Sequence, residues 1–503
     1  MFFDLASKDP DVLALDDLTR RRTRAELVDR VTRIARLLRD DLGLRPDDRV
    51  AVLMGNRAEY VELVWGALLA GVWLVPINWH LQADEVAYIL ADSDARVVFA
   101  DEEHEQVVRE LATTRVLVTG DAFEDALSAA SNEPMPADGP AGATMIYTSG
   151  TTGRPKGVKR ARPATLGDAM AGLARSGRAL GLDGSGPHLI TGPLYHAAPL
   201  LFAIYDQAAG APVIIMPRWD GRRALELLVE RGVRHTHMVP TMFVRLLQLP
   251  DDVRARFDAS SLQLVLHGAA PIAEHTKRAM IEWWGEILVE YWGATEGGVA
   301  TLVDSADWLA HSGTVGRPIP TFEVFAVDDD GGKLAADEPG LLYCRHKQLT
   351  DVFEYHGDAA KTAEAYLEPG AFTTGDVGRV DDDGYVYLSD RASSMIISGG
   401  VNIYPAEVEA VLQQHEAVAD VGVFGIPDDE WGEAVKAAVE LHAGTEASAE
   451  LEADIIAFGR ARLAAYKVPR SIDFEARLPR QDTGKLYTRL LRDRYWQGRD
   501  RKI

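Results

Sequence analysis

Helical and strand-like patterns alternate along the first half of the chain, and this alternation constrains the fold more than any other feature. Residues 24–42 have the spacing of an amphipathic helix, with Gly43 placed to end it. A short apolar strand at 49–54, a helix at 59–70 and a second strand at 72–77 follow. Further strand-like runs continue the pattern (96–100, 115–119, 212–216 and 263–267). Strands that alternate with helices pair in parallel, so we expect α/β layers.

Two later regions have a different character. Between Gly313 and about Asp390, short strands are separated by clusters of Asp and Gly, which predicts an antiparallel, barrel-like subdomain. The C-terminal segment combines helical and strand-like patterns (406–414, 418–424, 433–441 and 449–463). This mixture is typical of a small α+β domain. Bulky apolar residues are absent just after residue 391, so we place a domain boundary there, giving domains of residues 1–391 and 392–503.

The net charge limits the partners. The 503 residues include 53 Lys and Arg against 77 Asp and Glu, a formal charge of −24. Such a surface repels the phosphates of nucleic acids, so a nucleic-acid partner is excluded. An anionic small molecule would have to be met by local positive charge. The length exceeds a single hydrophobic core and supports the expectation of at least two domains.

The single cysteine and the apolar segments bear on the compartment. Cys344 is the only cysteine, which excludes an intrachain disulfide and a multi-cysteine metal site and suits a reducing cytosol. The first ten residues lack a basic segment followed by an apolar one, so no signal peptide is indicated. The apolar run at 64–77 is too short to cross a bilayer. We therefore expect a cytoplasmic protein without an integral membrane segment.

A glycine- and hydroxyl-rich loop follows a strand-like run at 143–147. Glycine lets backbone N–H groups approach a ligand closely, hydroxyls add donors, and lysine adds a charge suited to phosphate. The loop is not a standard P-loop, because Lys156 is followed by Gly157 instead of Ser or Thr. A flexible linker is the alternative, but a linker rarely lies between a buried strand and Arg-Pro-Lys-Gly. We predict a phosphate-binding loop comprising Thr148, Ser149, Gly150, Thr151, Thr152, Gly153 and Lys156.

Residues 147–157, Tyr-Thr-Ser-Gly-Thr-Thr-Gly-Arg-Pro-Lys-Gly, resemble the phosphate-binding loop of the acyl-adenylate-forming enzymes. This superfamily includes acyl- and aryl-CoA synthetases, adenylation domains of peptide synthetases, and luciferases. Four further motifs follow in the family's order, at 291–297, 374–376, 398–409 and 482–485. The resemblance covers nearly the whole chain. It implies a large N-terminal domain of layered α/β subdomains with a β-barrel-like subdomain, and a small mobile α+β C-terminal domain.

The resemblance implies that the chain binds ATP and Mg²⁺. Glu296 would bind Mg²⁺, which prefers one or two carboxylates together with phosphate oxygens. Thr295 would contact the α-phosphate, and Trp292 would stack on adenine, where the family usually has Tyr. Asp376 is suited to accept hydrogen bonds from both ribose hydroxyls, and Arg391 offers planar donors nearby. Small residues would form the adenine side of the site: Gly268, Ala269, Ala270 and Gly293.

The C-terminal motifs imply a second half-reaction with coenzyme A. By resemblance, Lys485 bridges the attacking carboxylate and the α-phosphate, and is withdrawn when the C-terminal domain rotates. Gly399 and Gly400 would then line the tunnel for the pantetheine thiol. The hinge departs from the family, because Ser393 stands where Lys or Asp is usual. Serine tolerates a change of backbone dihedrals but brings no charge to position the two poses.

The acid pocket is predicted from three short segments. His196 resembles the gate between the acyl pocket and the thiol tunnel. The pocket itself would be lined by His237, Met238, Thr241, His267 and Ala294. Peptide-synthetase domains for α-amino acids carry an Asp beside the gate position, and the chain has no acidic residue between Tyr195 and Tyr205. We therefore expect a largely apolar carboxylic acid without an α-amino group.

The resemblance predicts an ATP-dependent, AMP-forming acyl-CoA synthetase for a fatty, aryl or bulky polycyclic acid. One alternative is an acyl-adenylate synthetase that loads a carrier-protein thiol instead of CoA; acceleration by free CoA distinguishes the two. Another is a non-catalytic nucleotide-binding regulator, against which the intact Lys485, Glu296 and Asp376 argue. The candidate protein partners are the carrier protein and a second copy of the chain, as a homodimer.

Overall fold

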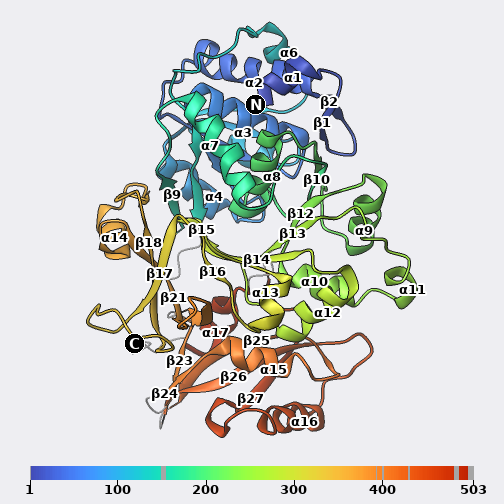
Figure 1. Ribbon diagram of the computed structural model, residues 1–503, viewed down its shortest axis with the longest axis vertical. Coiled ribbons are helices and arrows are strands. Elements are labelled where there is room, and N and C mark those ends of the chain that lie inside the picture. Colours follow the sequence, from blue (N-terminus) through green and yellow to red (C-terminus); the bar gives the residue numbers. More distant parts are fainter. Residues whose placement is uncertain are drawn as a thin grey trace.

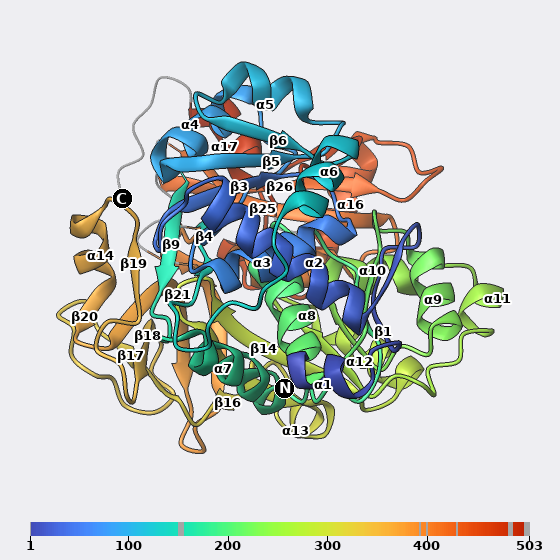
Figure 2. The same cartoon turned by 90° about the horizontal axis from the view of Figure 1, so that it is seen from above.

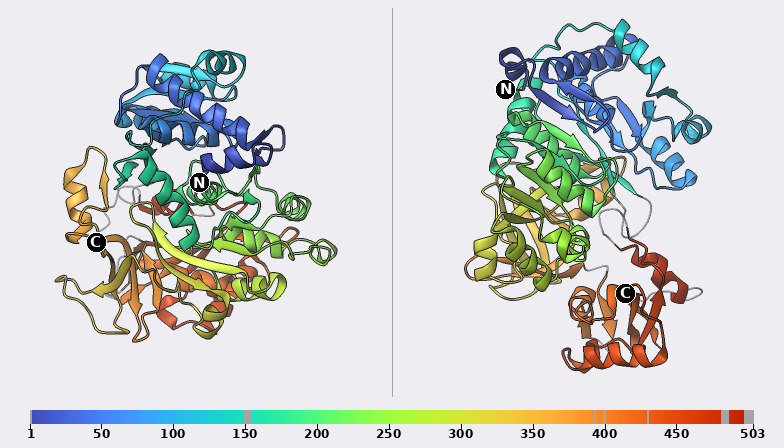
Figure 3. Two further views of the ribbon diagram at one scale, coloured as in Figure 1. Left: turned by 45° about the horizontal axis from the view of Figure 1, so that its top comes forward. Right: turned by 90° about the vertical axis from the view of Figure 1, so that its right-hand side faces the viewer.

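The computed structural model describes residues 2–148, 155–391, 394–398, 401–428, 431–480 and 486–496. The N-terminal layers form one end of an elongated molecule and the C-terminal α+β domain forms the other, with the antiparallel subdomain at the side (Figures 1 and 3). No helix in these ranges is long and apolar enough to cross a membrane. The boundary predicted after residue 391 falls on residues outside the described ranges, so its position stays a prediction.

The first sheet is entirely parallel, as the alternation predicts. Its order is β6-β5-β3-β4-β7, with β3 (Arg49–Leu53), β4 (Trp73–Pro76), β5 (Ala95–Ala100), β6 (Arg115–Val118) and β7 (Ala143–Thr144). The helices of this region are α2 (Arg24–Arg36, continued by a π-helical turn, Leu37–Asp41), α3 (Ala58–Ala70), α4 (Ala83–Ser93), α5 (Glu105–Leu111) and α6 (Asp121–Ala129). A capping box between Thr23 and Glu26 starts α2. Gly43 follows its last turn at φ +69°, which confirms the predicted stop.

The second sheet is larger and has the order β16-β15-β14-β13-β12-β10-β11-β1-β2. Its strands are β1 (Leu13–Asp16), β2 (Arg21–Thr23), β10 (His188–Ile190), β11 (Val213–Ile215), β12 (His235–Met238), β13 (Leu264–His267), β14 (Leu288–Ala294), β15 (Gly298–Asp304) and β16 (Arg317–Pro318). The pairs from β1 to β14 are parallel, whereas β2, β15 and β16 add antiparallel edges. The associated helices are α1 (Phe2–Lys8), α7 (Leu166–Ala179), α8 (Ala197–Ala209), α9 (Gly221–Glu230), α10 (Pro240–Leu247), α11 (Asp251–Arg254), α12 (Glu274–Trp284) and α13 (Ser305–Ala310).

Alternate residues of the second sheet face two different cores. Ile190 and Ile215 belong to the core that contains side chains of α2, α3 and α8. These helices therefore lie between the first sheet and the second sheet (Figure 2). Leu189 and Ile214 belong to the opposite core, formed with α9, α10 and α12. This period of two follows from the pleat of a strand. Helix α8 is thereby buried on one face of the strands that later supply the acid pocket.

The region from Gly313 to Asp390 is antiparallel, as predicted. Its sheet contains β17 (Phe322–Val327), β18 (Gly340–His346), β20 (Tyr366–Glu368), β21 (Ala371–Val380) and β22 (Val386–Arg391), with α14 (Ala359–Ala365) beside it. A bridge between Gly316 and Val386 connects the edge of the second sheet to β22, which curves the subdomain around its own core. A small antiparallel sheet, β8 (Ile146–Thr148), β9 (Lys156–Arg160) and β19 (Phe353–Tyr355), joins this subdomain to the N-terminal layers.

The C-terminal region is the predicted α+β unit. Its strands are β23 (Ile396–Ser398), β24 (Val401–Ile403), β25 (Val418–Asp428), β26 (Gly432–Leu441) and β27 (Ser471–Glu475). Its helices are α15 (Pro405–Leu412), α16 (Ala449–Arg460) and α17 (Thr488–Trp496), with a short 3₁₀ turn at Ala465–Lys467. β25 and β26 pair antiparallel along their length, and β27 adds in parallel. A separate apolar core under α15 and α16 supports the expectation of a distinct domain.

Candidate active site

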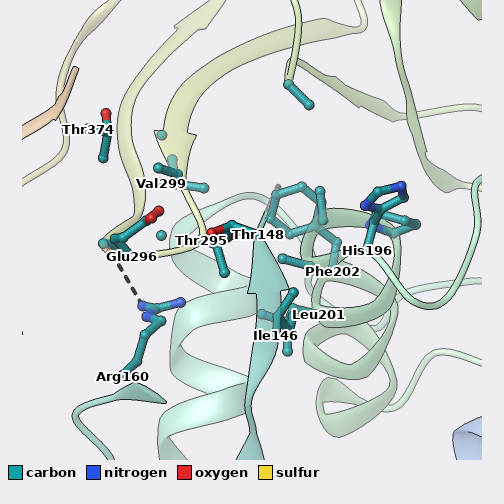
Figure 4. Close-up of a pocket in the computed structure, with 18 of the residues that line it drawn as sticks. Ile146, Thr148, Arg160, His196, Leu201, Phe202, Thr295, Glu296, Val299 and Thr374 are labelled. Carbon is teal, nitrogen blue, oxygen red and sulfur yellow. Dashed lines mark hydrogen bonds between the residues drawn. The ribbon is translucent and has the colours of Figure 1, made fainter. Parts of the chain in front are cut away.

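One cavity of about 640 Å³ is lined by nine of the predicted site residues. It lies where β8 and β9, the N-terminal part of α8, the β14–β15 hairpin and the antiparallel subdomain meet (Figure 4). Its polar end contains Thr148, Lys156, Thr295, Glu296 and Thr374. Its other end is walled by aromatic and aliphatic side chains, among them Phe202 and Val299. The cavity therefore joins a polar compartment to an apolar one.

Strands β8 and β9 hold the two ends of the predicted phosphate-binding loop. Thr148 and Lys156 are cross-strand partners, so the loop leaves and re-enters one antiparallel pair. Lys156 Nζ lies 2.6 Å from Asp358 Oδ2 and 5.6 Å from the centre of the Tyr355 ring. This contact places a cation at the polar end of the cavity. Most residues between the two strands lie outside the described ranges. The predictions for Ser149, Gly150, Thr151, Thr152 and Gly153 fall on these residues and stay predictions.

The hairpin between β14 and β15 presents the predicted metal-binding carboxylate. Glu296 lines the cavity at 9% exposure, and the Tyr355 hydroxyl donates a hydrogen bond to its Oε1 at 3.0 Å. A Cβ on Gly293 would meet the Gly298 carbonyl oxygen at 2.1 Å, so the close approach of the two strands requires glycine. Arg160 Nη2 donates to the Gly297 carbonyl at 3.3 Å (Figure 4). The hydrogen bonds from Tyr355 and Arg160 thereby hold the turn in place.

This arrangement fits a Mg²⁺ ion held together with nucleotide phosphates. Among the described residues no cluster of three or more acidic, His or Cys side chains could hold a metal by itself. Mg²⁺ commonly uses one or two carboxylates and takes its other ligands from phosphate and water. A single carboxylate at Glu296, facing the same cavity as Lys156, matches that requirement. The site suits a metal that arrives with ATP.

Asp376 is positioned by hydrogen bonds from two side chains. Trp292 Nε1 donates to Asp376 Oδ2 at 3.1 Å, and Thr374 Oγ1 donates to the same oxygen at 2.8 Å. The indole of Trp292 is packed in the core of the antiparallel subdomain and is 7% exposed. Thr374 reaches the cavity wall. Arg391 is the cross-strand partner of Asp376, which brings the two predicted ribose residues together along the backbone. The adenine-stacking and ribose roles themselves stay predictions.

The small residues after β13 approach the hairpin closely. A Cβ on Gly268 would meet the Tyr291 carbonyl oxygen at 2.5 Å. Ala269 lines the cavity with φ +67°, a conformation that costs free energy for any residue with a Cβ. Such strain is concentrated at functional sites. Of the three residues predicted to form the small-residue wall, Ala269 lines the cavity, whereas Gly268 and Ala270 are not among the lining residues; the adenine role stays a prediction.

Helix α8 contributes a wall that the sequence analysis missed. His196 caps its start and lines the cavity, with its ring 4.4 Å from that of Tyr195. Beyond it, Ala198, Phe202 and Tyr205 line the cavity at helical spacing. Residues three or four apart share one face of a helix. Once His196 was placed beside the pocket, this spacing could have predicted that Phe202 and Tyr205 face it as well. Asp206 lies on another face, where it accepts hydrogen bonds from His188 and His235.

Of the five residues predicted for the acid pocket, two line the cavity and three do not. His237 and Ala294 line the cavity. Met238 is packed in the core with α9 and α10, because neighbouring residues of a strand face opposite sides and β12 turns His237 toward α8. His267 is fully buried against Phe243, with ring centres 5.2 Å apart, and Thr241 lies on α10 outside the described lining.

His237 and Tyr291 are the polar groups at the acyl end. His237 Nε2 lies 3.1 Å from the Tyr291 hydroxyl. Burial, together with the nearby His188 and His196, lowers the pKa of His237 to about 3. Burial raises the pKa of the Tyr291 phenol. Both groups are therefore neutral near pH 7, and the Phe202 ring packs edge-on against each of them.

Four predicted residues of the C-terminal part lie outside the described ranges: Lys485, Ser393, Gly399 and Gly400. Tyr487 is described and lines the cavity, so the C-terminal domain contributes a side chain to the same site as the hairpin. Tyr487 directly precedes α17. The roles of the four undescribed residues stay predictions.

Comparison with known proteins agrees with this geometry. The family model for the AMP-binding enzyme matches residues 2–353, and the model for the AMP-binding enzyme C-terminal domain matches residues 407–485. The long-chain-fatty-acid–CoA ligase FadD13 of Mycobacterium tuberculosis (strain CDC 1551 / Oshkosh) is 33% identical over 463 residues, which cover 90% of this chain and 89% of that protein. The fatty acid–[acyl-carrier-protein] ligase ScoC of Streptomyces coeruleorubidus is 34% identical, over 92% and 89%.

A solved structure extends the likeness to the whole chain. The o-succinylbenzoate CoA synthetase of Bacillus subtilis, in complex with its acyl-adenylate intermediate, superimposes with a TM-score of 0.82 at 28% identity and covers 100% of this chain and 99% of its own. The family model for the AMP-binding enzyme and the curated relatives each cover well over half of the sequence. The chain thus belongs to the AMP-binding enzymes, the acyl-adenylate-forming superfamily, and within them it groups with the AMP-forming acid–CoA ligases.

Proposed function

We propose that this protein joins a largely apolar carboxylic acid to coenzyme A by way of an acyl-adenylate. The observation that carries the proposal is the single cavity with two unlike ends. Lys156, Thr295 and Glu296 mark an end suited to phosphates, and Phe202 and Val299 mark an end suited to hydrocarbon. An acid whose chain lies on the aromatic wall would bring its carboxylate to the hairpin. ATP and the acid, the two reactants of the first step, would thus bind in the same cavity.

In the first step a carboxylate oxygen attacks the α-phosphorus of ATP, and the bond to the bridging oxygen of pyrophosphate breaks. Lys156 and the loop after Thr148 would hold the β- and γ-phosphates, and Thr295 would orient the α-phosphate. Mg²⁺ bound at Glu296 would neutralise charge on the phosphates. Lys485 would neutralise the charge that develops between carboxylate and phosphorus. These groups act chiefly by positioning and electrostatics, as phosphoryl transfer requires.

In the second step the thiol of CoA attacks the acyl carbon, a thioester bond forms, and AMP leaves with the bonding electrons. We propose that residues 392–503 rotate as a C-terminal domain about Ser393 between the two steps. Gly399 and Gly400 would then line the thiol tunnel, and His196 would act as its gate. His196 at the start of α8, against the cavity, supports the gate role.

The acid is a fatty, aryl or bulky polycyclic one in this proposal. Relatives carry the names of fatty-acid and succinylbenzoate ligases, which span the first two classes. The aromatic wall formed by Phe202, Tyr205 and Tyr291 suits each of them. Asp206, which could have marked an amine site, is engaged with His188 and His235 behind the wall. This supports an acid without an α-amino group.

The decisive experiment is mass spectrometry of the products formed from the protein, Mg-ATP and a pooled panel of fatty, aryl and polycyclic acids, with and without CoA. Acyl-CoA that appears only in the tube with CoA would support the proposal and identify the acid class. Acyl-AMP that accumulates equally in both tubes would contradict CoA as the acceptor.

A carrier-protein thiol is the second candidate acceptor, favoured by the similarity to a fatty acid–[acyl-carrier-protein] ligase. It shares the whole first step and differs only in the surface met by the thiol. Adding a phosphopantetheinylated carrier protein in place of CoA would distinguish the two. Acylation of the carrier at a rate that free CoA does not match would favour this alternative.

A further inference from the structure

Two neutral polar side chains lie among the aromatic rings at the acyl end of the cavity. His237 on β12 is 3% exposed and Tyr291 on β14 is 7% exposed, and both line the cavity. The Phe202 ring centre lies 5.4 Å from that of His237 and 5.2 Å from that of Tyr291. A wall that only had to hold hydrocarbon would gain nothing from a buried imidazole and phenol, because buried polar groups cost free energy unless they are hydrogen-bonded. This pair therefore needs an explanation.

The pair can be analysed by counting its polar hydrogens. The pKa of about 3 for His237 and the raised pKa of Tyr291 leave one N–H on the imidazole and one O–H on the phenol near neutral pH. One of these two hydrogens is used in the 3.1 Å contact between His237 Nε2 and the Tyr291 oxygen. The other remains in either tautomer. It is the Nδ1–H of His237 when the phenol donates, and the phenolic O–H when the imidazole donates.

The described residues supply no acceptor for this remaining hydrogen. The single hydrogen bond recorded for the two side-chain polar groups is the one between them. His237 Nδ1 and the Tyr291 oxygen are not among the sealed polar atoms without a partner, so the remaining hydrogen has access to the space of the cavity, where it still needs an acceptor. Because both residues line the cavity, a ligand in the cavity is the natural source of the missing acceptor. Such a group would be an oxygen with a free lone pair.

The acceptor should be uncharged. The cations along the described wall are Lys156, Arg160 and Lys361, which lie with Glu296 and Tyr355 at the polar end. At the acyl end Phe202 packs on both members of the pair, Val299 belongs to the same apolar cluster as Tyr291, and the histidines His188 and His196 lie near His237. A second carboxylate there would be desolvated without a counter-charge, which is costly. A ketone, ether or hydroxyl oxygen needs only the one hydrogen that the pair can donate.

We infer that His237 and Tyr291 form a subsite that donates a hydrogen bond to a neutral oxygen on the hydrocarbon part of the acid. The preferred substrate is then an apolar acid that carries such an oxygen, instead of an acid with an unsubstituted hydrocarbon chain. The inference rests on the proposed function and adds to it a substrate class. The two residues select among acids and take no part in the adenylation chemistry.

The test compares straight-chain acids of one length in which a ketone occupies successive positions, together with the saturated parent acid. The readout is kcat/KM for pyrophosphate release with Mg-ATP. The wild type should favour one ketone position over the parent by about ten- to a hundredfold, the penalty expected when a buried donor is left unpaired by the wrong ligand. In His237→Phe/Tyr291→Phe, which keeps both rings and removes both polar hydrogens, the ratio should fall to about one or reverse.

Tyr60→Phe is the matched control, because it removes the hydroxyl of a buried tyrosine on α3 that lies outside the cavity lining. It should keep the wild-type ratio. If the double variant does not fold, Tyr291→Phe alone, which deletes one oxygen, should still reduce the ratio, whereas an unchanged ratio would contradict the inference. A wild type that adenylates the parent acid as well as every ketone would overturn the inference and leave the proposed function standing. A wild type that adenylates neither these acids nor any acid of the pooled fatty, aryl and polycyclic panel would overturn the proposed function, and the inference with it.

Discussion

The two ends of the cavity are built in different ways. The polar end is made of short, nearly continuous motifs: the β8–β9 pair around the glycine-rich loop, and the β14–β15 hairpin that carries Thr295 and Glu296. The acyl end is assembled from single side chains on α8, β12 and β14, far apart in the sequence. The residues proposed to act on every substrate thus lie on local turns. The residues proposed to contact the acid come together only because a helix packs on a sheet.

This comparison predicts that changes at the polar end reduce activity with every acid alike. Glu296→Gln keeps the size of the side chain and removes the charge proposed to bind Mg²⁺. We expect a loss of about a hundredfold or more in kcat for adenylation, the scale of one lost electrostatic contact in a transition state, and the same factor for each acid. Pyrophosphate release across an acid panel measures it. Glu282→Gln, at an exposed position of α12, is the control and should behave as wild type. A loss confined to some acids would break the comparison.

A change at the acyl end should alter the choice of acid. Phe202→Ala removes a ring that packs against His237 and Tyr291, which should lower the free energy of unfolding by about 3 kcal/mol. It should also shift preference toward bulkier acids, seen as KM changes that differ between acids. Phe257→Ala, whose ring packs on Trp283 and Trp284 in the other core, should destabilise without shifting preference. Equal KM changes for all acids would contradict the assigned wall.

The pKa of His237 gives a prediction about pH. Its pKa of about 3 in the folded state lies below the ordinary value of 6.5, so below pH 6.5 the unfolded chain binds a proton that the folded chain does not. The free energy of unfolding should therefore fall as pH decreases, by about 2 kcal/mol between pH 6.5 and 5 from this residue. In His237→Phe this share of the slope should vanish. Urea titrations at both pH values test it, and identical slopes in the two proteins would refute it.

The smallest effect is expected for Trp292→Phe. The change keeps an aromatic ring and removes the N–H that donates to Asp376 Oδ2, so we expect about a tenfold rise in KM for ATP or less. Trp283→Phe removes a comparable indole hydrogen bond, to the Arg254 carbonyl, away from the cavity, and should leave the KM for ATP unchanged. If both variants behave alike, Trp292 does not position Asp376 for the nucleotide.

The same contrast explains what the sequence could predict. The parallel layers, the antiparallel subdomain and the C-terminal unit were predicted close to their observed bounds, because apolar periodicity and clusters of Asp and Gly are local signals. Thr148, Lys156, Thr295 and Glu296, which line the cavity, could be proposed for the same reason, since they lie in contiguous motifs. Which of His237 and Met238 faces the cavity could not be predicted, because that depends on how β12 lies between β10 and β13.

The aromatic wall was missed for a related reason. Phe202 and Tyr205 look like ordinary core residues of an apolar helix, and only the packing of α8 against β12 and β14 turns them toward the cavity. The pairing of Asp206 with His188 and His235 likewise joins positions that no local pattern connects. The residues proposed to contact the acid therefore depend on long-range packing, whereas those proposed to contact the nucleotide can be predicted from local motifs.

The central claim is that one cavity holds both halves of an acyl-adenylate. A crystal structure with a non-hydrolysable acyl-sulfamoyl adenosine tests it most directly. We expect the sulfamoyl group beside Thr295, the adenosine toward Thr374, and the acyl chain along Phe202 and Tyr291. An analogue bound with its acyl chain outside this wall, or with its adenosine away from the hairpin, would contradict it.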